Sequence, residues 1–94
     1  MVPKEMDKVT AQELDQFAKT KPFLMVVLYA NWCGHCKEMI KRLGPKMRNY
    51  DELLFLEQRY VDENLAPYFP RVLIYHKGVP REGTVEDVYA VLES

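Results

Sequence analysis

The segment FLMVVLYANWCGHCKEMIKRL at residues 23–43 decides how this chain folds. It opens with a run from Phe23 to Ala30 that is almost entirely apolar and rich in β-branched and aromatic side chains. Such a run is typical of a central strand that is buried on both faces of a sheet. Met39 and Leu43 then recur at the spacing of one helix face. We therefore expect a buried strand that leads into a helix through the sequence CGHC at residues 33–36.

Shorter patterns predict the remaining elements. Thr10 and Glu13 form the pattern of a capping box, which predicts a helix that ends before Lys21-Pro22. Gly44-Pro45 predicts a kink or a restart in the helix after the CGHC sequence. We further expect strands at 4–9, at 53–56 with a continuation towards Val61, at 71–76 and near 79–82. Residues 62–69 should form a loop or a single helical turn, and Lys77-Gly78 a turn. A last helix should be capped at Thr84, with Val88, Val91 and Leu92 facing inward.

Composition excludes several classes of protein. The chain has 94 residues, 48% of them hydrophobic, which is enough apolar surface for one small globular domain. With 13 Lys and Arg against 14 Asp and Glu, it has no excess positive charge for binding nucleic acid. The apolar run from Phe23 to Ala30 is too short to span a bilayer, so we expect no membrane partner. The N-terminal residues 1–10 contain no apolar signal region, which favours an intracellular location.

The two cysteines carry the chemistry. Cys33 lies where the expected strand ends and the helix begins, and unpaired backbone N–H groups and the helix dipole stabilise a thiolate there. Cysteines in such motifs have pKa values of roughly 3.5–7.5, against about 8.5 for a free thiol. Cys33 is therefore the candidate nucleophile, and Cys36, one helical turn later, can resolve a mixed disulfide. His35 lies between them and is a candidate for stabilising the Cys33 thiolate through its imidazole.

Metal binding is the main chemical alternative, because Cys-x-x-Cys is also half of a common zinc site. A closed zinc site needs four ligands, and only His35 and His76 remain as nitrogen donors. His35 lies inside the motif and is poorly placed to share one metal with both sulfurs. A cluster bridged between two subunits is a further alternative. We expect redox chemistry with no metal and no cofactor other than the Cys33–Cys36 disulfide itself.

Residues 28–37, LYANWCGHCK, resemble the thioredoxin superfamily, and specifically a catalytic domain of protein disulfide isomerase. All fixed positions of that family's Tyr-Ala-x-Trp-Cys-Gly-His-Cys-Lys pattern are met. Phe69-Pro70, followed by the expected strand at 71–76, is a second match. The resemblance implies a single thioredoxin-like domain over residues 1–94. Its fold class would be α/β, with three α/β/α layers around a mixed sheet of four strands, or five if residues 4–9 add one.

The resemblance also implies a binding surface for protein substrates. In the superfamily the proline before this strand is cis and faces the cysteine pair, so we expect a cis bond at Pro70. The backbone of Phe69 would pair with an extended substrate segment, a form of strand addition. Trp32 would form the other wall of this surface, unless it only packs against the protein. Gly34, within the motif, completes the expected substrate-binding residues.

The chain departs from the family at its buried charge pair. Family members place an Asp or Glu six residues before the first cysteine, where it accepts the proton of the second thiol. Here that position is Val27. The lysine that accompanies the acid aligns with Tyr60. Glu38, Glu57 or a water molecule are the candidate substitutes for the missing acid.

Other departures indicate a shortened domain of nearly glutaredoxin size. The family's helix-kinking proline would align with Lys41, whereas this chain has Pro45. The family's third helix is expected to shrink to residues 62–68. Glutaredoxins bind glutathione with a Gly-Gly pair, and the single Gly83 is the counterpart here, which makes glutathione a weak prediction.

We therefore expect a monomeric thiol–disulfide oxidoreductase of the protein disulfide isomerase type, acting on protein or peptide thiols and disulfides. A reductase, an oxidase or glutathione would recycle it. Two alternatives remain: a reductant of the thioredoxin or glutaredoxin kind, and a binding module of the same fold with weak or no turnover. The absence of a buried acid at Val27 keeps the second alternative open.

Overall fold

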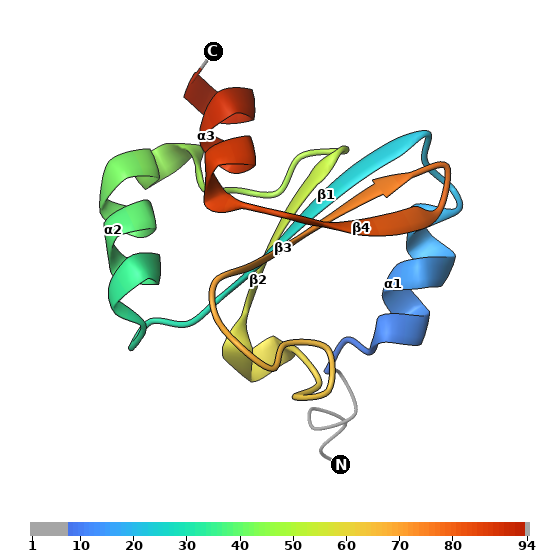
Figure 1. The fold of residues 1–94 in the computed structure, drawn as a ribbon, viewed down its shortest axis with the longest axis horizontal. Helices are drawn as coiled ribbons and strands as arrows, with labels where there is room; N and C mark the ends of the chain where they lie inside the picture. The colour runs from blue at the N-terminus through green and yellow to red at the C-terminus, as the bar shows by residue number, and fades with distance from the viewer. Residues whose placement is uncertain (1–7, 94) are drawn as a thin grey trace.

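The computed structural model describes residues 8–93 and contains every expected helix and strand in the expected order, apart from the strand at residues 4–9 (Figure 1). That strand falls almost wholly outside the described residues. The elements are α1 (Ala11–Ala18), β1 (Phe23–Tyr29), α2 (Gly34–Leu43), a 3₁₀ turn η2 (Gly44–Lys46), β2 (Leu53–Glu57), a second 3₁₀ turn η3 (Gln58–Tyr60), β3 (Arg71–His76), β4 (Val79–Gly83) and α3 (Val85–Glu93).

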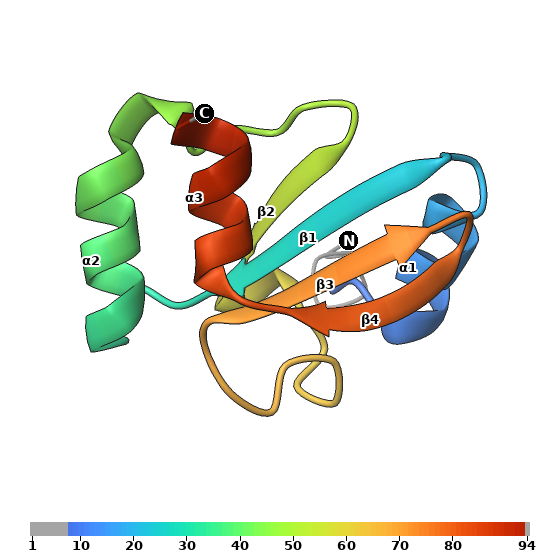
Figure 2. The same ribbon diagram turned by 45° about the horizontal axis from the view of Figure 1, so that its top comes forward.

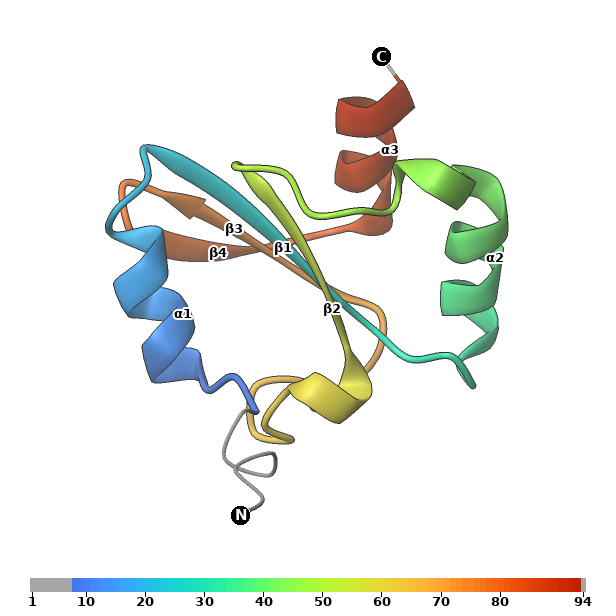
Figure 3. The same ribbon diagram turned by 180° about the vertical axis from the view of Figure 1, so that it is seen from behind.

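The four strands form one mixed sheet in the order β2-β1-β3-β4. β2 runs parallel to β1, whereas β3 and β4 are antiparallel to their neighbours. Helix α1 covers one face of this sheet, and α2 and α3 cover the other, as the two opposite views show (Figures 1 and 3). Figure 2 shows α2 and α3 side by side. The expected three-layer arrangement around a four-stranded sheet is confirmed.

The continuous apolar run of β1 is explained by burial on both faces of the sheet. Leu24, Val26 and Leu28 pack on the α1 side. Met25 and Val27 pack on the other side, in the cluster that α2 and α3 cover. Successive side chains of a strand alternate between faces, so a strand between two helical layers needs apolar residues at every position.

The predicted capping box of α1 is present. The Glu13 backbone N–H donates to Thr10 Oγ1 at 3.1 Å, and the Thr10 N–H donates to Glu13 Oε1 at 3.1 Å. α1 ends at Ala18, so the chain leaves the helix earlier than Lys21-Pro22 would require. After α2, Gly44 has φ +52° and the 3₁₀ turn follows, which confirms the restart at Gly44-Pro45.

The structure differs from the expectation for β2 and, in part, from the expectation for α3. β2 stops at Glu57 and does not continue to Val61, which forms only an isolated parallel bridge with Val9. In α3, Val88 is fully buried and Leu92 packs partly buried against the same cluster, as expected, whereas Val91 is 49% exposed and lines a surface pocket beside Leu92. A helix of this length presents only a narrow stripe to the core, and Val88 occupies its centre.

Residues 62–70 form turns and bends, the loop outcome of the two expected for this segment. The segment is nevertheless part of the core, because Leu65 and Ala66 are buried in the cluster on the α1 side. Its backbone is tied down by Arg71, whose guanidinium donates to the Leu65 carbonyl. Tyr68 adds a bond from its hydroxyl to Glu82 at 2.7 Å. Among residues 8–93, no helix has the length and hydropathy that crossing a bilayer requires.

Gly83 joins β4 to α3 at a point of close approach. A Cβ atom there would lie 2.7 Å from Ile74 Cδ1 and 3.0 Å from Asp87 Oδ2. Ile74 is buried, and Asp87 accepts the Thr84 backbone N–H at 2.9 Å at the start of α3. Packing therefore accounts for this glycine.

We expect Gly83→Ala to lower the free energy of unfolding by about 1–3 kcal/mol, because the new methyl group overpacks this contact. Gly34→Ala is the matched control, since a Cβ at Gly34 would meet nothing within 4 Å. Its effect should stay within about 0.5 kcal/mol. Urea unfolding followed by circular dichroism measures both. Equal effects of the two substitutions would contradict the packing explanation.

Candidate functional site

The site begins where β1 ends and α2 starts. Cys33 is the N-cap residue of α2, with φ −82° and ψ 128°. Its backbone carbonyl accepts the Lys37 N–H at 2.9 Å, which begins the hydrogen-bonding pattern of the helix. The sequence places an apolar strand and an amphipathic helix on either side of a short link, and this link delivers the sulfur to the positive end of the helix. Both cysteines are free thiols in this structure.

The Cys33 sulfur is surrounded by hydrogen-bond donors. Desolvation alone would raise the pKa of its thiol above the ordinary 9.0. The backbone N–H of Cys36, the Cys36 thiol and the backbone N–H of His35 outweigh that effect and lower the pKa. These donors stabilise the thiolate, which is the nucleophilic form of cysteine. The predicted activation of Cys33 therefore has a structural basis in the first turn of α2.

Cys36 is in the opposite situation. It is fully buried, and the backbone N–H of Ala30 donates to its sulfur at 3.4 Å. Burial raises the pKa of its thiol to about 11, and the neighbouring Cys33 contributes to the rise. The Cys33 thiol is thus the more acidic of the pair, and the Cys36 thiol the less acidic.

The backbone N–H of His35 contributes to the stabilisation of the Cys33 thiolate. We predicted that its imidazole stabilises the thiolate. In the structure its backbone N–H makes that contact, and its side chain is exposed to solvent. The first turn of a helix directs its backbone N–H groups at the N-cap residue, and the role expected of the imidazole stays a prediction.

The Phe69 carbonyl lies against the Cys33 sulfur, and the bond between Phe69 and Pro70 is cis, as expected. The Cys33 thiol donates to the Phe69 carbonyl at 3.4 Å. The Trp32 indole meets the Phe69 ring edge to face, with the ring centres 5.8 Å apart at 86°. Trp32 is 64% exposed, so packing against the protein does not account for most of its surface. Trp32, Cys33 and Phe69 together line an open apolar surface.

Gly34 adds open space beside this surface. It is exposed, and a side chain at this position would meet no other atom of the protein within 4 Å. The fold therefore does not require glycine here. Of the expected substrate-binding residues, Trp32 and Phe69 meet beside Cys33. Gly34 follows Cys33 in the chain, and Pro70 follows Phe69.

Glu57, the last residue of β2, and Gln58, the next residue, contact the segment before Cys33. The sequence alone does not predict these contacts. Gln58 Oε1 accepts the Trp32 indole N–H at 2.7 Å. The Glu57 carboxylate accepts a hydrogen bond from the Asn31 side chain. In both contacts the two partners are 26 positions apart in the sequence. The parallel pairing of β1 and β2 brings them together, and no local motif at residues 57–58 reveals them.

The position of the missing acid is fully apolar. Val27 is completely buried between Phe55 and Val72 on the neighbouring strands. No charged side chain is buried among residues 8–93. Glu57 is the least exposed of the candidate acids, with 17% of its side chain accessible, but its carboxylate is already bound by Asn31 and Arg59. Tyr60, at the lysine position, is exposed.

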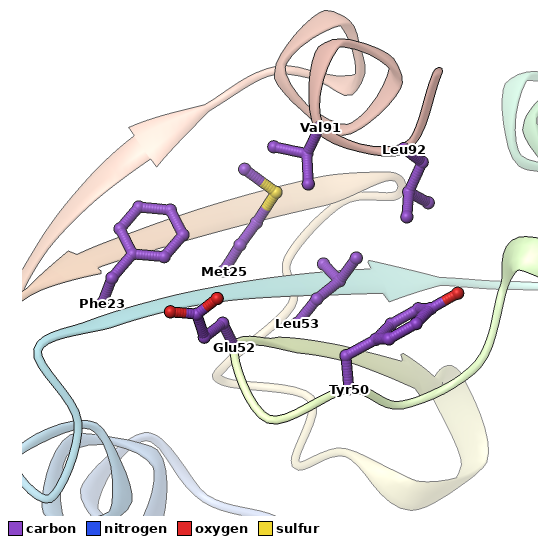
Figure 4. A pocket seen from close by; sticks show the side chains of 7 residues that line it. All are labelled: Phe23, Met25, Tyr50, Glu52, Leu53, Val91 and Leu92. Carbon is purple, nitrogen blue, oxygen red and sulfur yellow. The ribbon is translucent and has the colours of Figure 1, made fainter. Parts of the chain in front are cut away.

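One pocket lies away from the cysteines and is lined mostly by apolar side chains. This pocket of about 300 Å³ lies at the start of β1, at the other end of the strand from the cysteines (Figure 4). Its lining is apolar apart from Glu52 and the Tyr50 hydroxyl at its rim. Within residues 8–93, no group of three or more His, Cys, Asp or Glu side chains is arranged to hold a metal ion.

Comparison with known proteins agrees with this geometry. The family model described as Thioredoxin matches residues 5–89. A stretch of 37 residues is 38% identical to the probable protein disulfide-isomerase A4 of Caenorhabditis elegans, and a stretch of 31 residues is 45% identical to protein disulfide-isomerase A5 of Mus musculus. These stretches cover 39% and 33% of this chain but only 6% of either relative.

Solved structures show the same fold. A mutant thioredoxin from Halobacterium salinarum aligns with a TM-score of 0.57 at 16% identity, covering 96% of this chain and 91% of the other. A thioredoxin from Plasmodium falciparum aligns with a TM-score of 0.54 at 18% identity, covering 89% and 92%. At these identities the likeness concerns the fold alone.

The two thiols should differ sharply in reactivity. A lowered pKa gives Cys33 more thiolate at a given pH, so its rate of alkylation by iodoacetamide should rise with pH and reach half of its maximum below pH 9. Cys36, with a pKa near 11, stays protonated at pH 7 and should react at least ~10-fold more slowly. Mass spectrometry of the alkylated peptides measures both rates. Comparable rates at the two cysteines would contradict this account of the site.

Restoring an acid at Val27 should be costly. Val27→Asp places a carboxylate in a cluster without buried polar partners, and we expect a loss of about 3 kcal/mol or more in the free energy of unfolding at pH 7. Burial raises the pKa of such a carboxyl group, so the loss should shrink as the pH falls and the neutral form becomes populated. Val27→Thr is the uncharged control, with an expected loss of about 1–3 kcal/mol and no such pH dependence. Chemical denaturation at pH 4 and pH 7 tests both.

Proposed function

The chain belongs to the thioredoxin family, and from this premise we propose that it is a thiol–disulfide oxidoreductase that exchanges disulfides with protein substrates through Cys33 and Cys36. The observation that carries the proposal is the asymmetry of the pair. One sulfur is stabilised as a thiolate at the N-terminus of α2, and the other is buried as a thiol one turn away.

In the reducing direction, the Cys33 thiolate attacks one sulfur of a substrate disulfide. The substrate S–S bond breaks, its other sulfur leaves as a thiolate, and Cys33 becomes joined to the substrate. Cys36 then loses its proton and attacks the Cys33 sulfur, which releases the second substrate thiol and leaves the Cys33–Cys36 disulfide. Two electrons pass to the substrate. The oxidising direction runs the same steps backwards, and neither direction needs a bound cofactor.

Substrate recognition in this proposal uses the surface around Cys33. An extended peptide would pair with the backbone beside Pro70 and lie along the indole of Trp32. The exposure of Trp32 and the open space at Gly34 support this, because both leave the sulfur accessible to a chain as large as a protein segment. The substrates are therefore protein or peptide thiols and disulfides.

We further propose activity of the protein disulfide isomerase type rather than of the thioredoxin type. Donors that stabilise the Cys33 thiolate favour the dithiol form, and this makes the disulfide the stronger oxidant. The local identity to two disulfide isomerases supports the same choice. Reduction potentials are about −180 mV for protein disulfide isomerase and about −270 mV for thioredoxin, a gap worth roughly 4 kcal/mol.

Equilibration with glutathione redox buffers measures this potential directly. A value near −180 mV supports the isomerase type, and a value near −270 mV identifies a reductant instead. A binding module without turnover is the second candidate, favoured by the apolar surroundings of Val27. If Cys33 and Cys36 fail to form a disulfide under mild oxidation, the binding module is the correct function.

Variants of the two cysteines test the mechanism. We expect Cys33→Ser to abolish insulin reduction, because it removes the attacking sulfur. Cys36→Ser should instead accumulate mixed disulfides with substrate, since the resolving thiol is missing; a gel shift that is reversed by dithiothreitol detects them. Gln12→Ala, an exposed change on α1, serves as the control with normal activity. Full insulin reduction by Cys33→Ser would disprove the proposed nucleophile.

A further inference from the structure

We propose that Gln58 is a positioning residue that holds the Trp32 indole in place as a wall of the substrate-binding surface. This inference rests on the proposed function, because it concerns how substrate proteins are recognised. It adds to that function a residue outside the CGHC sequence and outside the Phe69–Pro70 segment.

Burial does not fix the orientation of Trp32. The side chain is 64% exposed, which leaves it free to adopt other rotamers unless a specific contact holds it. The one contact that uses its polar atom is the hydrogen bond from the indole N–H to Gln58 Oε1, at 2.7 Å. Gln58 is the first residue of η3, at the end of β2.

A second bond of the same kind lies directly beside the first. The side chain of Asn31 donates to the Glu57 carboxylate, which also accepts from Arg59 Nε at 3.1 Å. Two consecutive residues of the β1–α2 link are thus tied to two consecutive residues at the end of β2. The parallel pairing that ends at Tyr29 and Glu57 brings these two segments together.

The tie from Gln58 has a direct consequence at the sulfur. The indole that Gln58 holds meets the Phe69 ring edge to face at 5.8 Å, and the Phe69 carbonyl accepts the Cys33 thiol. Holding the indole therefore keeps an apolar surface continuous from Trp32 to the attacking atom. When the surface is already ordered, less binding free energy is lost in fixing its side chains, so a substrate segment binds more tightly.

This geometry predicts a specific kinetic effect. Gln58→Ala removes the acceptor without touching the cysteines, so we expect the KM for insulin to rise roughly two- to twelve-fold, the range for one neutral hydrogen bond. Turnover of a small disulfide such as hydroxyethyl disulfide should not change, because it does not need the Trp32 wall. Gln58 is exposed, so the substitution should leave folding intact.

Fluorescence gives a readout that does not depend on activity. Trp32 is the only tryptophan in the chain, so its emission reports on this side chain alone. We expect lower anisotropy in Gln58→Ala than in the unaltered protein, because the indole gains freedom. Gln58→Glu keeps an acceptor oxygen and should restore both the anisotropy and the KM. Gln12→Ala, an exposed glutamine on α1, is the matched control.

The outcomes separate this inference from the proposed function. Unchanged anisotropy in Gln58→Ala overturns the positioning role, even if insulin is reduced normally. An equal loss of activity with insulin and with hydroxyethyl disulfide also overturns it, since the residue would then act on the cysteines. If the unaltered protein fails to reduce insulin, the proposed function fails, but the anisotropy still tests the tie between Gln58 and Trp32.

Discussion

The structure depends on one electrostatic constraint: the backbone N–H groups at the start of α2 must point at the sulfur of Cys33. A hydrogen-bonded helix leaves these donors without partners, and here they meet a thiol instead of water. The arrangement needs β1 to end at a fixed place, because the link to α2 is short. Burial of β1 on both faces fixes that place. The position of the reactive sulfur therefore depends on the burial of the core strand β1.

The same constraint separates the two cysteines. Cys33 sits at the helix end, where donors outweigh desolvation, and Cys36 faces the core, where desolvation dominates. No buried carboxylate is available among the residues described to accept the Cys36 proton. The surrounding residues thus make the Cys33 thiol the more acidic of the two, and the backbone N–H of His35 is one of the donors responsible.

Sequence predicted the parts of the fold that follow from local chemistry. The capping box at Thr10, the doubly buried run of β1 and the restart at Gly44-Pro45 are all short-range patterns, and all are confirmed. The cis bond at Pro70 followed from a resemblance to a known superfamily. The contacts of Gln58 could not be predicted, because they depend on how β1 and β2 align, and that register is set by packing over the whole sheet.

The loop between η3 and β3 both covers part of the core and carries the Phe69–Pro70 segment. Residues 61–66 cover the apolar layer beneath α1, and the same stretch of chain then turns into Phe69 and Pro70. The Phe69–Pro70 end of this loop cannot loosen without disturbing a segment that covers hydrophobic surface. A substrate protein bound there, as proposed, would therefore also stabilise the folded state of this small domain against unfolding.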